Sequence, residues 1–424
     1  MTESVSLGLL ACTAQTAGME AQADEAERYP LGLCLSGGGY RAMLFHAGSL
    51  ARLNDAGLLS CIDMISSVSG GSMASGLLAY VWQKLKFEDG VATNFREEYL
   101  SRILSFSQIF ADAPSIAKGI FNPFSSAAEE AVKVFEARLL DGSNIWLKSL
   151  PQKPWFVFCS SNLSTGSLFR MSNRYVADYR VGYAPKADLP LATAIAASAA
   201  FPPVLSPLRI DLSKFEWKSG KIDTSIGDPV PPGRAVLTDG GVYDNHGIEP
   251  TLKRCDCVLV SDAGAPWEYS GKSFWNYISQ LRRVLDTTDN QVRSLRRRTL
   301  VDIFTASKKA DEMGLDAATR RVLNARTRGV YWSISSGGQD LSNYASFQMP
   351  SSSIKPAGIG TYLHFLGTAE TEHLINWGYY VCDSRMRQYY PDSISAVGGP
   401  PIASGTVKPS RVAKISKAIF DLVR

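Results

Sequence analysis

Three short segments of this 424-residue chain carry the residue types that acyl-transfer chemistry requires. In the first, Ser67-Val68-Ser69-Gly70-Gly71, an apolar run at 61–68 gives way to residues with helical spacing. A sharp strand-to-helix turn projects one serine and needs small residues two positions before and after it. Ser69 is therefore a candidate nucleophile at a helix N-terminus, with Gly70 and Gly71 supporting the turn. The alternative is that Ser69 only caps the helix.

The second segment contains three consecutive glycines, Gly37, Gly38 and Gly39, followed closely by Arg41. They come directly after an apolar run at 30–36 that we interpret as a buried strand. Successive backbone N–H groups at the start of a helix form an anion cradle, which could hold either a phosphate or the oxyanion of acyl transfer. Arg41 would add positive charge or brace the loop.

The glycine run also fits the G-x-G-x-x-G/A pattern of dinucleotide-binding folds. Such a fold needs an acidic residue at the end of the next strand, where this chain has the serine-rich stretch 66–69. The chain also lacks a Gly-Lys-Ser/Thr sequence, so the nucleotide P-loop pattern is absent. The sequence therefore favours the oxyanion interpretation of the glycines.

The third segment places Asp239 at the end of an apolar run, before Gly240 and Gly241. The carboxyl ends of parallel strands converge at one edge of a sheet, so Asp239 could meet Ser69 despite their separation in sequence. Asp239 would then act as the base, with Asn245 fixing the loop that follows it. The alternative is an aspartate that only caps a turn, which is common before glycine.

The order and spacing of these segments resemble the patatin-like phospholipase family, as does Ala-Ser-Ala-Ala-Phe-Pro-Pro at 197–203. The resemblance covers about residues 30–265 and implies a catalytic dyad of Ser69 and Asp239. It also implies an oxyanion hole, built from Gly37, Gly38, Gly39 and Arg41, and no cofactor or metal. The implied activity is hydrolysis of carboxylic esters in phospholipids or other acyl lipids, of the phospholipase A or lysophospholipase type. Ser67 departs from the family pattern, in which glycine is commoner.

Two alternative functions remain open at this point. A Ser-His-Asp esterase would need one of the four histidines, His46, His246, His364 or His373, as its base. The other alternative is a phospholipase effector whose degradation of membrane lipids is triggered by a ligand or a partner protein.

The elements that position these residues alternate between strand and helix, which predicts an α/β fold with a mostly parallel central sheet and helices on both faces. The resemblance implies a three-layer α/β/α arrangement with helical insertions and a C-terminal extension. We expect a flexible leader at 1–28, a catalytic core at 29–310 with a helical insertion at 95–150, and an extension at 311–424 packed on the core. A strand is also predicted at 299–304, after a long helix.

Composition adds few constraints. A net charge of +4 is too small to indicate nucleic-acid binding, and seven cysteines in a chain of this length favour free thiols in a reducing compartment. We therefore expect a cytoplasmic protein with transient contact at a membrane surface. Three segments are candidates for lipid contact, the aromatic stretch 103–124, the segment 274–278 and the basic amphipathic tail 409–424. The oligomeric state is left open.

Overall fold

The computed structural model describes residues 28–108, 127–202, 205–219, 228–267, 269, 271, 276–337, 339–349, 352–360, 366–394, 396–403 and 405–407. The tail 409–424 and most of the aromatic stretch 103–124 lie outside these residues, as does the leader up to residue 27. Of the segment 274–278, only positions 276–278 are described.

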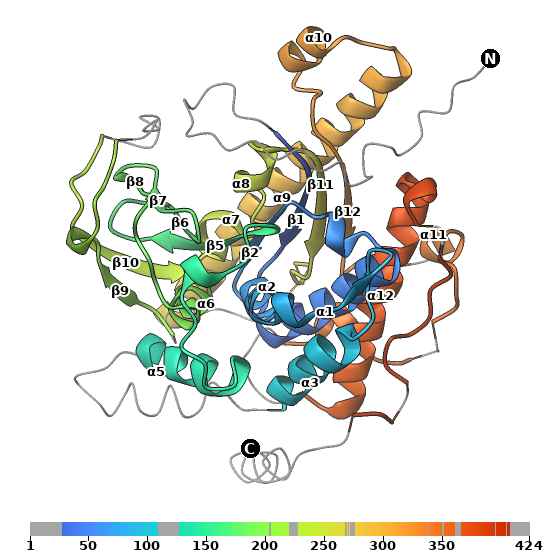
Figure 1. The fold of residues 1–424 in the computed structure, drawn as a ribbon, viewed down its shortest axis with the longest axis horizontal. Coiled ribbons are helices and arrows are strands. Elements are labelled where there is room, and N and C mark those ends of the chain that lie inside the picture. Colours follow the sequence, from blue (N-terminus) through green and yellow to red (C-terminus); the bar gives the residue numbers. More distant parts are fainter. Residues whose placement is uncertain are drawn as a thin grey trace.

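The centre of the fold is a parallel sheet with strand order β12-β11-β1-β2-β5. Its strands are β1 (Tyr29–Leu35), β2 (Met64–Val68), β5 (Trp155–Asn162), β11 (Cys255–Asp262) and β12 (Arg328–Ser333). Figure 1 shows helices in front of this sheet and behind it, which confirms the predicted α/β class with a mostly parallel centre. The strand predicted at 299–304 is wrong, because these residues belong to the long helix α9 (Tyr277–Glu312).

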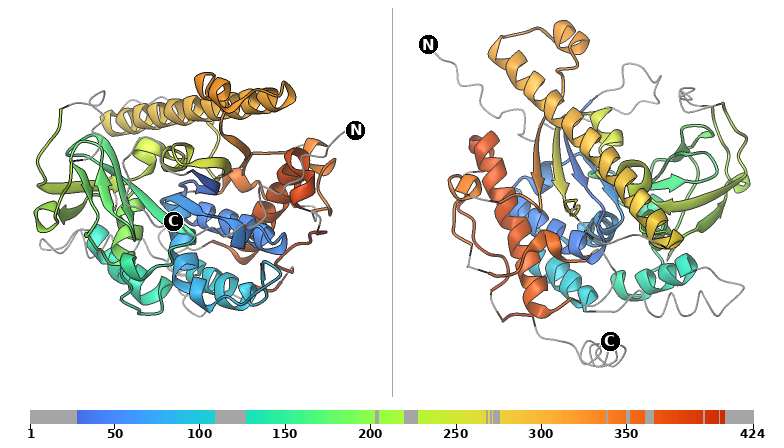
Figure 2. Two further views of the ribbon diagram at one scale, coloured as in Figure 1. Left: turned by 45° about the horizontal axis from the view of Figure 1, so that its top comes forward. Right: turned by 180° about the vertical axis from the view of Figure 1, so that it is seen from behind.

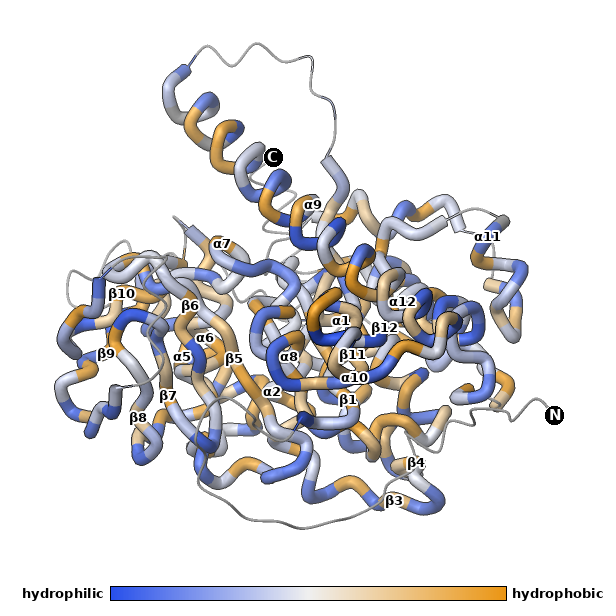
Figure 3. The backbone as a smooth tube through the Cα atoms, turned by 90° about the horizontal axis from the view of Figure 1, so that it is seen from above, coloured by the Kyte–Doolittle hydropathy of each residue, from blue (hydrophilic) through white to orange (hydrophobic). Residues whose placement is uncertain are grey.

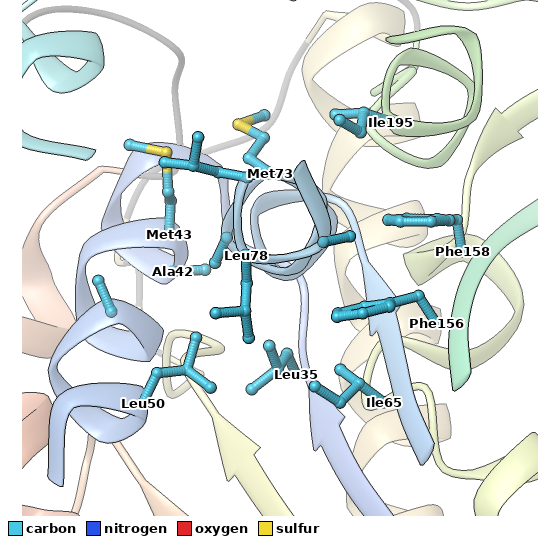
Figure 4. Close-up of a cluster of buried hydrophobic side chains, with 14 of the residues drawn as sticks. Leu35, Ala42, Met43, Leu50, Ile65, Met73, Leu78, Phe156, Phe158 and Ile195 are labelled. Carbon is cyan, nitrogen blue, oxygen red and sulfur yellow. The ribbon is translucent and has the colours of Figure 1, made fainter. Parts of the chain in front are cut away.

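Alternating side chains of the central strands build two separate cores. On one face, Leu35 of β1, Ile65 of β2 and Phe158 of β5 pack with α1 (Gly39–Asp55) and α2 (Gly70–Val81), as Figure 4 shows. On the other face, Cys34 and Val157 belong to a smaller core that includes Leu300 of α9. Figure 2 shows α9 crossing this second face, so the three layers are helices, sheet and helices.

Beyond β5 the sheet becomes antiparallel, which the sequence did not predict. One branch consists of β6 (Ser167–Ser172), β7 (Val176–Asp178) and β8 (Gly182–Ala184), and the other of β10 (Arg234–Asp239) and β9 (Leu208–Asp211). β5 pairs with β6 along one edge and with both β2 and β10 along the other.

Strands β2 and β10 meet end to end along this shared edge of β5. β2 runs parallel to β5 and its last residue, Val68, lies opposite Cys159. β10 runs antiparallel and its last residue, Asp239, lies opposite the next residue, Ser160. The two strands therefore point at each other, and the residue after Val68 arrives beside the end of β10.

Helix α12 (Thr368–Tyr389) packs closely on α1, which begins at the glycine run. A Cβ atom at Gly378 would lie 1.9 Å from the carbonyl oxygen of Phe45, and one at Gly48 would lie 1.8 Å from that of Ile375. The two backbones thus touch through paired glycines. β12 and α12, both beyond residue 310, complete the sheet and its helical layer; the domain boundary at 310 stays a prediction.

The remaining elements are short helices and one hairpin. The helices are α3 (Ser101–Ser107), α5 (Ala127–Val134), α6 (Leu191–Ser198), α7 (Gly241–Asp244), α8 (Glu249–Leu252), α10 (Ala317–Val322) and α11 (Gln339–Ser342), and the hairpin joins β3 (Phe87–Glu88) to β4 (Val91–Ala92). Within the described ranges, no helix combines the length and apolar character that crossing a membrane requires.

Replacing Gly378 with alanine should destabilise the fold, because the added methyl group would press on the backbone of α1. We expect Gly378→Ala to lower the free energy of unfolding by about 1–3 kcal/mol or more. Denaturant unfolding measures this change. Gly399→Ala is the matched control, since its Cβ would meet no atom within 4 Å. Equal stability of the two variants would contradict the close helix contact.

Candidate active site

Ser69 occupies a strained turn between β2 and α2. Its backbone has φ 52° and ψ −118°, outside the conformations that serine ordinarily adopts. The turn brings backbones into contact, since a Cβ atom at Gly70 would lie 2.1 Å from the carbonyl oxygen of Gly39. Gly71 donates its N–H to the carbonyl of Ser36 at 3.1 Å. A strained, glycine-flanked serine at a helix N-terminus has the form of a nucleophile elbow.

Ser67 fills the position where the family pattern more often has glycine. Its hydroxyl lies 3.0 Å from that of Ser72 and accepts a hydrogen bond from the Ser75 hydroxyl at 2.7 Å. The side chain thus joins the end of β2 to the first turns of α2, and the turn accommodates it.

Asp239 lies buried at the end of β10, beside the Ser69 turn. Its Oδ1 accepts the N–H of Gly241 at 2.7 Å. Oδ2 is buried and has no hydrogen-bond partner among the described residues. The Ser69 hydroxyl nevertheless lies close enough to lower the pKa of this carboxyl. Catalytic hydrogen bonds are often loose without substrate and tighten when it binds. The free oxygen is thus available to the serine.

Burial raises the pKa of Asp239 to about 6, although the nearby hydroxyl of Ser69 and the N–H of Gly241 lower it. The charge of Asp289 on α9 raises it further. A carboxylate with this pKa is a better base than an exposed aspartate, and it is still largely ionised at neutral pH.

The three glycine N–H groups predicted for the oxyanion hole differ in their hydrogen bonding. Gly37 donates its N–H to the carbonyl of Asn245 at 3.0 Å, so this amide is already engaged. The N–H groups of Gly38 and Gly39 have no backbone acceptor among the described residues. Gly38 has φ 139°, a conformation that glycine adopts readily and that places its amide at the start of α1. The N–H of Gly70 likewise has no backbone acceptor among the described residues.

Arg41 braces the site from behind and its guanidinium is fully engaged. Nε and one terminal nitrogen donate to the carbonyl of Ala263 at 3.1 and 2.8 Å, and the other donates to that of Ile359 at 2.7 Å. Burial lowers the pKa of Arg41 to about 10, so it remains charged at neutral pH. Of the two roles considered for Arg41, these contacts favour bracing the loop.

The loop after Asp239 is held by Asn245 and Asp244. Asn245 Oδ1 lies between two glycines, where a Cβ atom at Gly37 would be 2.3 Å away and one at Gly241 would be 2.7 Å away. Asp244 is fully buried and accepts the backbone N–H groups of His246 and Glu249 at 3.2 and 3.0 Å. Both side chains fix the path of the loop.

Ser198, at the end of α6, joins the two catalytic turns, and sequence analysis did not identify this role. Its Oγ accepts the N–H of Ser69 at 3.0 Å and donates to the carbonyl of Cys159 at 2.6 Å. Its carbonyl accepts the N–H of Gly240 at 3.1 Å. The signal available in the sequence was a serine within the 197–203 segment, in an otherwise apolar, alanine-rich helix.

None of the three described histidines hydrogen-bonds to Ser69 or Asp239. His46 lies between the Ser261 hydroxyl and the Ser36 carbonyl at 2.8 and 2.9 Å, and burial lowers its pKa to about 4. His246 Nε2 lies 3.4 Å from Asp262. His373 stacks on Trp377 of α12. His364 lies outside the described residues.

A serine at a strand-to-helix elbow, a buried carboxylate and free amides on an α/β sheet are together the features of carboxylic ester hydrolases as a class. The chain belongs to the patatin-like phospholipase family, whose family model matches residues 33–252, just over half of the chain. This finding confirms the resemblance stated from the sequence.

Other comparisons are more limited. A meiotic protein of Saccharomyces cerevisiae, named as a phospholipase, is 48% identical over 42 residues, which are 10% of this chain and 7% of that protein. Human GIVD cytosolic phospholipase A2, solved with methyl gamma-linolenyl fluorophosphonate, matches with a TM-score of 0.47 at 14% identity, over 89% of this chain and 60% of that one. VipD from Legionella pneumophila matches with a TM-score of 0.35 at 12% identity, over 98% and 81%.

The pKa of Asp239 predicts how activity depends on pH. If ionised Asp239 is the base, kcat/KM for a soluble ester should fall tenfold per pH unit below about pH 6 and level off above it. A pH series with p-nitrophenyl butyrate measures this, after subtraction of the rate of Ser69→Ala. A profile with no inflection between pH 4 and 7 would contradict the assignment.

Removing the Ser198 hydroxyl should slow the chemistry at Ser69, because the N–H of Ser69 loses its acceptor. We expect Ser198→Ala to reduce the rate of labelling by a fluorophosphonate by roughly 10–100-fold, with a loss of stability of about 1–3 kcal/mol from the unpaired buried N–H. Ser75→Ala is the matched control, as it removes a buried hydroxyl of α2 that bonds to Ser67. Equal labelling rates in the two variants would exclude this positioning role.

Proposed function

We propose that this protein hydrolyses carboxylic ester bonds of phospholipids, as a phospholipase A or lysophospholipase, through Ser69 and Asp239. The observation that supports the proposal is the end-to-end meeting of β2 and β10, because the Ser69 turn follows one strand and the buried Asp239 ends the other. Membership of the patatin-like phospholipase family supports a lipid ester as the substrate.

In the first half of the reaction, Asp239 accepts the proton of the Ser69 hydroxyl while Oγ attacks the ester carbonyl. The N–H groups of Gly38, Gly39 and Gly70 surround the developing oxyanion, and each such donor contributes about 3 kcal/mol. The tetrahedral intermediate then collapses to an acyl-enzyme. Asp239 donates this proton to the leaving alcohol, which for a diacyl phospholipid is the glycerol hydroxyl of the released lysophospholipid.

In the second half, water replaces the alcohol. Asp239 accepts a proton from this water, whose oxygen attacks the acyl carbonyl held by the same amides. The second tetrahedral intermediate releases the fatty acid, and Ser69 regains its proton from Asp239. The carboxyl needs its raised pKa in both halves, since it acts alternately as base and as acid.

A ligand-triggered effector is the second candidate function, and one surface pocket would serve it. The pocket, of about 370 Å³, is open to solvent and is lined by Ser335, Lys355, Ala357 and Trp377, among others. Ala357 is two residues from Ile359, whose carbonyl binds Arg41 behind the glycine run. A ligand in this pocket could therefore act on the oxyanion loop. Hydrolysis of a soluble ester by the purified protein without any addition would argue against a required trigger.

Two substitutions test the proposed dyad. Ser69→Ala should abolish release of fatty acid from phospholipid vesicles, and Asp239→Asn should reduce it by at least about 10³-fold, because an amide cannot accept the serine proton. Mass spectrometry of the released fatty acids and lysolipids measures both rates. Undiminished hydrolysis by either variant would refute the dyad.

The free energy of unfolding of Asp239→Asn shows whether this variant loses activity through its chemistry or through its folding. The pKa of Asp239 is higher in the folded protein than the ordinary aspartate value of 3.8, so the folded state binds this proton more tightly than the unfolded state. Ionisation of Asp239 therefore destabilises the fold as pH rises from about 4 to 6. At pH 8, Asp239→Asn should be more stable than the wild type by up to ~3 kcal/mol, and this difference should vanish near pH 4.

A further inference from the structure

Helix α9 exposes a row of apolar side chains to solvent. Tyr277, Leu281, Val284, Leu285 and Leu295 are all largely exposed, and their spacing of three, four and ten residues places them on one side of the helix. Val284 and Leu285 are exposed to 60% and 59%. The row extends for about 27 Å along the helix. Figure 3 shows the first half of α9 standing clear of the body, with hydrophobic turns along it.

Charged side chains of α9 contact the loops around the site. Arg293 lies 3.6 Å from Asp262 and donates to the carbonyl of Ala265 at 2.9 Å. Arg296 lies 3.8 Å from Asp244 in the loop after Asp239, and 3.6 Å from Glu249. The protein-facing part of α9 thus combines these charged contacts with Leu300 in the second core, whereas the apolar row has no cover among the described residues.

Neighbouring exposed residues extend the apolar row toward the site. Trp267 follows β11 and is 41% exposed. The guanidinium of Arg283 stacks on its indole ring, 3.6 Å from the ring centre. Tyr269 is almost fully exposed. Val242 is exposed on α7, only three residues after Asp239, and α7 contacts α9. Exposed apolar side chains therefore lie both on the helix that follows Asp239 and along α9, which that helix contacts.

We propose that this surface docks on a phospholipid bilayer and holds the catalytic edge against it; the inference builds on the proposed function. Tryptophan and tyrosine side chains favour the boundary between lipid tails and head groups, and aliphatic side chains favour the tails beyond it. Arg298 is exposed and forms no ion pair with a described residue, so it can contact an anionic head group. A substrate that resides in a bilayer would enter from this side.

Vesicle binding tests the proposal without catalysis. In a Ser69→Ala background, the triple substitution Leu281→Ser, Val284→Ser and Leu285→Ser should lower the partition coefficient on phosphatidylcholine–phosphatidylserine vesicles more than about tenfold, measured by co-sedimentation. Binding of the parent should weaken on vesicles of phosphatidylcholine alone and at high salt.

The matched control replaces Met313, Val322 and Leu323 with serine. These residues are equally exposed but lie at the far end of α9 and in and after α10. The control should bind vesicles like the parent, and the α9 variant with intact Ser69 should hydrolyse a soluble ester at the wild-type rate. If the wild type hydrolyses no ester but its vesicle binding depends on α9, the proposed function is refuted and the docking surface is supported.

Three results would overturn the docking surface. They are failure of the parent to bind vesicles, equal binding by the α9 variant and its parent, and equal loss in the α9 and control variants. A fourth result, a parent dimer that the α9 substitutions convert to a monomer with unchanged vesicle binding, would show by sedimentation velocity that a second copy of the chain occupies this surface.

Discussion

The site depends on one arrangement of backbone, in which β2 and β10 share an edge of β5 and end facing each other. The pairing of their last residues with successive residues of β5, Cys159 and Ser160, defines where each strand stops. The distance between the Ser69 turn and Asp239 is therefore set by the spacing of consecutive residues in one strand, which a folded sheet cannot easily change. Ser198 reinforces this arrangement, because it binds the first residue of one turn and a glycine of the other.

Two buried aspartates near this junction show how surroundings determine chemistry. Asp239 has few partners and burial raises its pKa to about 6. For Asp262, burial acts in the same direction, but contacts with His246, Arg293 and Tyr331 lower its pKa well below the usual range. Asp262 thus stays charged and anchors α9, whereas Asp239 can gain and lose a proton. The same helix that bears the exposed apolar row is held by the permanently charged aspartate.

The sequence predicted the α/β class, the strands that flank each glycine-rich segment and the family, because each depends on local patterns of apolar residues and glycines. It placed Asp239 at the end of a parallel strand, but β10 is antiparallel, since strand direction depends on pairing with β5. The sequence predicted that all three glycine N–H groups would be free. The loop after Asp239 lies close enough, however, for the carbonyl of Asn245 to accept the N–H of Gly37. Residues 299–304 have the composition of a strand, yet they continue the helix, with Leu300 packed into the second core.

The most direct test of this account is a crystal structure of the protein after reaction with a long-chain fluorophosphonate. The account predicts a phosphonyl group bonded to Ser69 Oγ, its oxygen within hydrogen-bonding distance of the N–H groups of Gly38 and Gly39, and the Asp239 carboxylate beside Ser69 Oγ. The ends of β2 and β10 should lie as they do in the free protein. A phosphonyl group on another residue, or one whose oxygen points away from the glycine amides, would contradict the account.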